Sequence, residues 1–143
     1  MNALWEKVNR EMVAKILAEL EYERTLRAEP VSSDGWRITM GTESWQFRAA
    51  RGIWGWLHID PDSLTTASGD AVEAESALLQ LATVLEMSDA QTAEHMEDLY
   101  ATLRGDMQLL QARDALDADA LIHLDPDELQ CLMRGHPKFI FNK

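Results

Sequence analysis

The chain has 143 residues, and its 25 acidic against 13 basic side chains give a formal net charge of −12. Because binding to nucleic acid needs clustered positive charge, this balance argues against nucleic acid as the main partner. No run approaches the roughly 18 consecutive apolar residues of a membrane span, so we expect no membrane partner. The single cysteine, Cys131, excludes an internal disulfide. The first ten residues lack a signal-peptide core, which favours a cytoplasmic protein.

The first predicted element is an amphipathic helix over residues 4–24. Apolar side chains recur at three- and four-residue steps and form one stripe, which comprises Trp5, Val8, Met12, Ile16 and Leu20. Pro30 and the polar residues 32–35 then end the helical pattern.

Three strands are predicted next, at residues 36–40, 44–50 and 53–59, so that a β-meander spans 36–59. Gly41 with Thr42, and Arg51 with Gly52, form turn-sized gaps in which glycine can take a positive φ. Four of the five tryptophans fall in these strands, and without cationic neighbours we interpret them as a helix-facing core. We expect the third strand to carry two of them on one face and the first two strands to pack the other two together (Trp54 and Trp56; Trp36 and Trp45).

Further helices are predicted over residues 70–86, 88–113 and 126–134. Ser88 and Gln91 have the spacing of a capping box, and Asp125 followed by Pro126 is typical of a helix start. Gly105 interrupts the second of these helices without shifting its apolar stripe, so we expect one continuous helix. The predicted fold class is α+β, with helices packed on one face of a three-stranded antiparallel β-meander in a single domain spanning 1–143.

The last nine residues, 135–143, read GHPKFIFNK. Glycine permits a close backbone approach and the side chains of His136, Asn142 and Lys143 offer donors, a combination that suits a carboxylate or phosphate. The residue types alone favour a structural interpretation, in which Gly135 ends a helix and the rest is a strand within a core.

GHPKFIFNK resembles the opening of a motif of the NRPS-independent siderophore synthetases, in which Gly-His-Pro is followed by a lysine and then an arginine. Further stretches resemble the same family in order: WEKVNREMVAKILAELEYE, RGIWGWLHID, MSDAQTAEHMEDLYATLRGDMQLLQARDAL and LQCLMRGHPKFIFNK. Other branches carry a second His-Pro where this chain has Phe139 and Ile140. Family members are several times longer than 143 residues, so the resemblance implies the N-terminal domain of a larger synthetase.

The resemblance also implies the chemistry. In this family ATP, with Mg²⁺, activates a carboxylate of citrate or of a citryl monoamide as an acyl-adenylate. An amine such as N6-acetyl-N6-hydroxylysine then displaces AMP. The positions that match the motif are Gly135, His136, Pro137 and Lys143. We expect Gly135, His136, Asn142 and Lys143 to bind substrate or nucleotide, because charge developing on the oxygens needs fixed donors. No catalytic or metal-ligating residue is expected within the 143 residues, so we expect the isolated chain to be inactive; whether it forms a homo-oligomer stays open.

A different class of protein also fits the early part of the chain. Secretion chaperones are small, acidic and cytoplasmic, and they open with a helix and a three-strand meander. They return to strands after the next helix, whereas here two long helices are predicted in succession. A chaperone or other binding module would also leave GHPKFIFNK unexplained.

Overall fold

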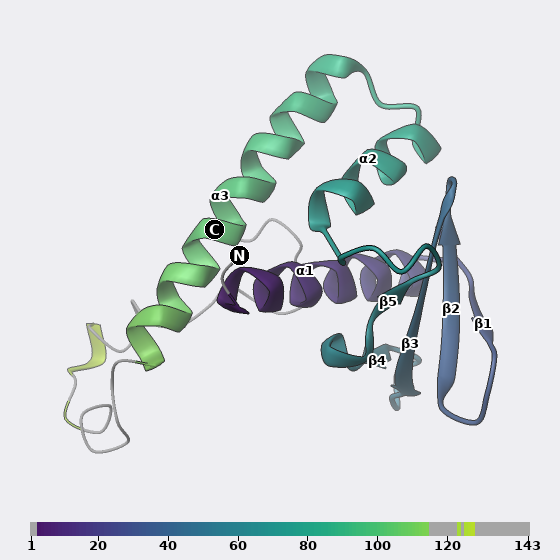
Figure 1. The fold of residues 1–143 in the computed structure, drawn as a ribbon, viewed down its shortest axis with the longest axis horizontal. Coiled ribbons are helices and arrows are strands. Elements are labelled where there is room, and N and C mark those ends of the chain that lie inside the picture. The colour runs from purple at the N-terminus through teal and green to yellow at the C-terminus, as the bar shows by residue number, and fades with distance from the viewer. Residues whose placement is uncertain (1–2, 115–122, 124, 128–143) are drawn as a thin grey trace.

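The computed structural model describes residues 3–114, 123 and 125–127 (Figure 1). Three helices and a small sheet make up this part of the chain. In order, the elements are α1 (Ala3–Tyr22), β1 (Ala28–Pro30), β2 (Gly35–Met40), β3 (Glu43–Arg51), β4 (Leu57–Ile59), a 3₁₀ turn η1 (Pro61–Ser63), β5 (Thr65–Thr66), α2 (Ala74–Val84) and α3 (Asp89–Asp114). The α+β class is confirmed. None of the helices in the described residues is long and apolar enough to cross a membrane.

The sheet is antiparallel, with the strand order β1-β2-β3-β4 and with β5 pairing with β3. It is therefore the predicted meander with two additional short strands. β1 contains Pro30, which a sheet tolerates at an edge because proline has no amide hydrogen to donate. β5 is only two residues long, too short for any alternation of apolar and polar residues to be recognised in the sequence.

The third predicted strand begins four residues later than expected. Residues 53–56 form a loop instead, in which the Gly55 amide donates to the Gly52 carbonyl (3.0 Å) and Gly55, not Gly52, takes the positive φ of 81°. Ile53 and Trp54 are consequently 96% and 81% exposed. The prediction that Trp54 shares a strand face with Trp56 is wrong, because the apolar alternation runs past the end of the strand into the loop.

One face of the sheet carries the hydrophobic core. Trp45 is opposite Ile38 in the register, and Trp36 is opposite Phe47, so the two tryptophans are diagonal neighbours on that face. α1 contacts β4, and α2 contacts β2, so both lie against the sheet. α3 packs against α1 and α2 and forms a further layer beside them (Figure 1). The expectation that all the helices lie directly on the meander therefore needs this correction.

The ends of the helices follow local rules. Ser88 and Gln91 form the predicted capping box, with each backbone amide donating to the other side chain at 3.0 and 3.1 Å. α3 continues through Gly105 as expected. α2 begins at Ala74 rather than at 70, because residue 73 is still extended (φ −123°, ψ 131°). Of the helix predicted at 126–134, the structure describes only Pro126 and Asp127, both helical.

Candidate functional site

The residues that the sequence singled out for chemistry lie outside the described part of the chain. They are Gly135, His136, Asn142 and Lys143. Their roles as substrate- or nucleotide-binding groups stay predictions, and no geometry is assigned to them. The described residues nevertheless contain one polar hollow that the sequence did not indicate.

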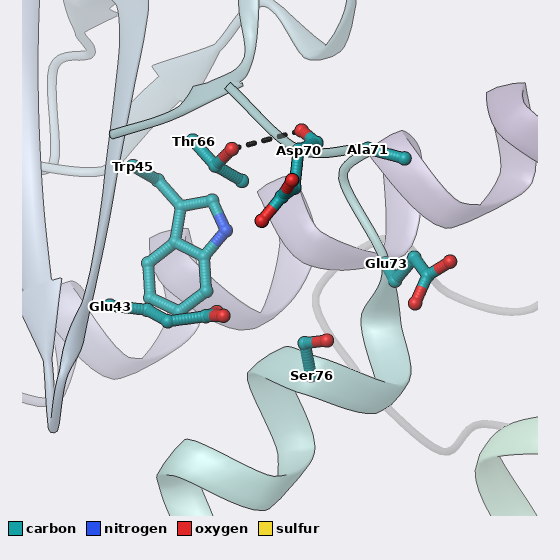
Figure 2. Close-up of a pocket in the computed structure, with 7 residues that line it drawn as sticks. All are labelled: Glu43, Trp45, Thr66, Asp70, Ala71, Glu73 and Ser76. Atoms are coloured by element: carbon teal, nitrogen blue, oxygen red, sulfur yellow. Dashed lines mark hydrogen bonds between the residues drawn. The ribbon is translucent and has the colours of Figure 1, made fainter. Parts of the chain in front are cut away.

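This hollow has a volume of about 230 Å³ and lies between the start of β3, β5 and the start of α2 (Figure 2). Seven residues line it: Glu43, Trp45, Thr66, Asp70, Ala71, Glu73 and Ser76. We call it the acidic hollow, because three of the seven carry carboxylates and none is basic. The sheet register assembles its floor, since Trp45 on β3 is paired with Thr66 on β5.

The loop between β5 and α2 fixes the position of Asp70 at the rim. The Thr66 hydroxyl donates to the Asp70 carbonyl at 2.9 Å, which Figure 2 shows as a dashed line. The Ser68 hydroxyl donates to the Asp70 carboxylate, also at 2.9 Å. Ser and Asp commonly form such local hydrogen bonds in turns. Hydrogen bonds within this turn therefore fix the Asp70 carboxylate, although Asp70 is exposed to solvent.

Negative charge extends from the hollow along the first turn of α2. The Tyr100 hydroxyl on α3 donates to the Glu75 carboxylate. That hydrogen bond, followed by burial and by the negative charges of Glu75 and Glu73, raises the pKa of Tyr100 above its ordinary value. Glu73 lines the hollow as well, so the same carboxylate contributes to both places.

Sequence reasoning missed the hollow because its parts are far apart in the chain. Glu43 follows a turn, Asp70 lies in a loop and Glu73 precedes a helix, and each position is ordinary for an acidic residue. Only the β3–β5 pairing and the contact of α2 with the sheet bring them together. Trp45, in contrast, is buried as the core interpretation predicts.

Comparison with known proteins gives one consistent answer. The chain is 55% identical over 139 residues to the aerobactin synthase of Escherichia coli, which covers 97% of this chain and 24% of that protein. It is 40% identical over 149 residues to the aerobactin synthase of Vibrio mimicus, which covers 100% of this chain and 25% of that protein.

A solved structure agrees with these matches. It is the aerobactin synthetase of a hypervirulent pathotype of Klebsiella pneumoniae, which superposes with a TM-score of 0.91 at 56% identity over 98% of this chain. This chain is a homologue of the aerobactin synthases.

The aerobactin synthase relationship is partial in length. The chain spans about a quarter of the curated relatives that it matches and 26% of the Klebsiella protein chain. No protein-family model matches it. The family resemblance read from the sequence is therefore confirmed, and the homologues are siderophore synthetases, a class of ligases.

Proposed function

We propose that this chain acts as one domain of a longer, cytoplasmic siderophore synthetase of the aerobactin synthase type. The observation that carries the proposal is the 55% identity over 97% of the chain, together with the TM-score of 0.91. Identity over nearly the whole chain and the shared fold support assigning the same reaction class.

The proposed reaction is an ATP-dependent condensation. ATP, with Mg²⁺, would activate a carboxylate of citrate or of a citryl monoamide as an acyl-adenylate. N6-acetyl-N6-hydroxylysine would then attack and release AMP. We assign His136, Asn142 and Lys143 to the oxygens that gain negative charge, with Gly135 allowing the backbone to come close. These assignments rest on the family motif and on the chemistry of the side chains.

The competing interpretation, a small acidic chaperone, loses support from the order of elements. Such chaperones return to strands after the second helix. Here α2 is followed directly by the 26-residue α3, and the whole arrangement superposes on a synthetase.

A first test separates the domain from the longer enzyme. We expect the purified 143-residue chain to release no AMP when it is mixed with ATP, a citrate-derived carboxylate and the hydroxylysine derivative. We also expect the native gene product to have an intact mass of roughly four times 16.2 kDa, since the chain spans 24% of the Escherichia coli relative. AMP release by the 143-residue chain, or a native mass near 16.2 kDa, would reject the proposal.

A further inference from the structure

Two polar groups in the acidic hollow, one on Trp45 and one on Glu43, have no hydrogen-bond partner among the described residues. The Trp45 side chain is 1% exposed, and in the described part of the chain nothing accepts a hydrogen bond from its indole N–H. Figure 2 shows the indole nitrogen directed toward Asp70. Glu43 Oε2, beside the ring, is also buried and accepts no hydrogen bond from the described residues. A buried carboxylate oxygen without a donor is unfavourable, so a ligand that forms hydrogen bonds with both groups is favoured.

The two groups require opposite partners. The indole N–H is a donor only and needs an oxygen acceptor, whereas the Glu43 carboxylate needs a donor. Asp70 and Glu73 add negative charge at the rim, and no residue lining the hollow in the described chain is basic. The preferred ligand therefore carries a positive charge and an oxygen atom.

An organic cation fits better than a metal ion. No group of three or more His, Cys, Asp or Glu side chains in the described residues is placed to hold a metal. The carboxylates come from the start of β3 and from the loop between β5 and α2, around a space of about 230 Å³, which has room for a small molecule. A primary ammonium group has three donors that can be shared among carboxylates spaced in this way.

We propose that the acidic hollow of Glu43, Trp45, Asp70 and Glu73 binds a small primary amine that carries a neighbouring oxygen acceptor. The ammonium group lies between the Glu43 and Asp70 carboxylates, and the oxygen accepts from the Trp45 indole N–H. This inference uses only described residues and does not depend on the proposed function.

The experiment follows the indole N–H resonance of Trp45 by NMR in the 143-residue chain, with ethanolamine as the probe. We expect a saturable shift of that resonance. Two compounds serve as controls: propylamine keeps the charge and lacks the oxygen, and ethylene glycol lacks the charge. Each should bind more weakly than ethanolamine and shift the resonance less. Sodium chloride at the same ionic strength controls for screening.

Two substitutions complete the test. Glu43→Gln should weaken ethanolamine binding about tenfold, because it removes a charge-assisted hydrogen bond. Glu97→Gln removes an exposed carboxylate of α3 outside the hollow and should leave binding unchanged. Circular dichroism of each variant confirms that the fold is retained. A shift that does not saturate, that sodium chloride reproduces, or that Glu43→Gln leaves intact would overturn the proposal.

Discussion

The side chain of Asn9 on α1 caps the start of α2, sixty-five residues further along the chain. Its Oδ1 accepts a hydrogen bond from the Ala74 backbone amide at 2.9 Å, and its Nδ2 donates to the Trp5 carbonyl at 3.0 Å. Asn9 is 5% exposed. The residue at the usual capping position, Glu73, makes no capping hydrogen bond with its side chain. A tertiary contact therefore caps the N-terminus of α2, whereas in most helices the residue just before the helix does so.

Replacing Asn9 with alanine should lower the free energy of unfolding by about 2 kcal/mol, because it leaves the buried Ala74 amide without an acceptor. Urea denaturation followed by circular dichroism measures the loss. Glu73→Ala is the matched control and should change stability by less than about 0.5 kcal/mol. Equal losses in the two variants would show that Asn9 is not the cap.

Arg51, at the end of β3, forms hydrogen bonds with α1 and with the loop that follows β3. Its guanidinium donates to both carboxylate oxygens of Glu21 (2.9 and 3.3 Å) and to the Gly55 carbonyl (2.8 Å). It also lies 5.3 Å from the ring centroid of Trp36. We expect Arg51→Ala to cost about 1 kcal/mol, and Arg51→Lys to recover only part of that, since lysine cannot form the two-pronged contact.

The comparison for Arg51 is Arg37, which makes an exposed ion pair with Glu29 at 3.1 Å. Arg37→Ala should change the free energy of unfolding by less than about 0.5 kcal/mol, because solvent screens such pairs. Thermal unfolding of both variants at low and high salt checks the ranking. If Arg37→Ala were the more costly of the two, the account of Arg51 would fail.

The sequence predicted the features that depend on residues close together in the chain. Ser88 and Gln91 are three positions apart and contact each other directly, so their spacing is sufficient information. The core role of Trp45 follows equally from its place in an alternating strand.

Long-range pairing explains what the sequence could not predict. The alternation at residues 53–56 looks like a strand, yet no strand in the described part of the chain pairs with it. Gly52 and Gly55 form a turn there instead, which leaves Trp54 exposed. The cap from Asn9 and the pairing of Trp45 with Thr66 join positions that no short window contains. For the same reason Glu43 and Asp70 could not be grouped before the sheet was known.

Two helices end on a residue other than glycine in the left-handed region. After α2, Glu86 has φ 54°, with the Met87 amide donating to Ala82 and the Glu86 amide to Thr83. After α1, Arg24 has φ 64° with the same two-bond pattern. Both are Schellman motifs, in which glycine is the preferred residue because a Cβ atom is strained there.

Glu86→Gly should therefore raise the free energy of unfolding by about 1 kcal/mol. Glu86→Ala keeps the Cβ atom and should give no gain, which separates backbone strain from loss of charge. Urea denaturation measures both variants. A stabilised alanine variant would assign the gain to charge instead.

The hydrogen bond between Tyr100 and Glu75 predicts a pH dependence. The pKa of Tyr100 is raised in the folded state. The hydrogen bond therefore stabilises the fold fully below the pKa of tyrosine in the unfolded chain, about 10. This stabilisation is lost as the pH rises through the pKa of Tyr100 in the folded protein. The chain has two tyrosines, so a Tyr22→Phe variant leaves Tyr100 as the single phenol. Its ionisation can then be followed by ultraviolet absorbance. Adding Glu75→Gln should lower the pKa of Tyr100; an unchanged titration would contradict the assigned cause.

The most direct test of the proposed function is amine-dependent release of AMP by the native gene product. The account predicts that AMP forms from ATP only when both a citrate-derived carboxylate and N6-acetyl-N6-hydroxylysine are present. It also predicts a loss of at least about tenfold in His136→Ala, whereas His123→Ala, at an exposed turn, should keep the activity of the native protein. A folded native product that releases no AMP above the amine-free control, or a His136→Ala variant as active as His123→Ala, would contradict the account.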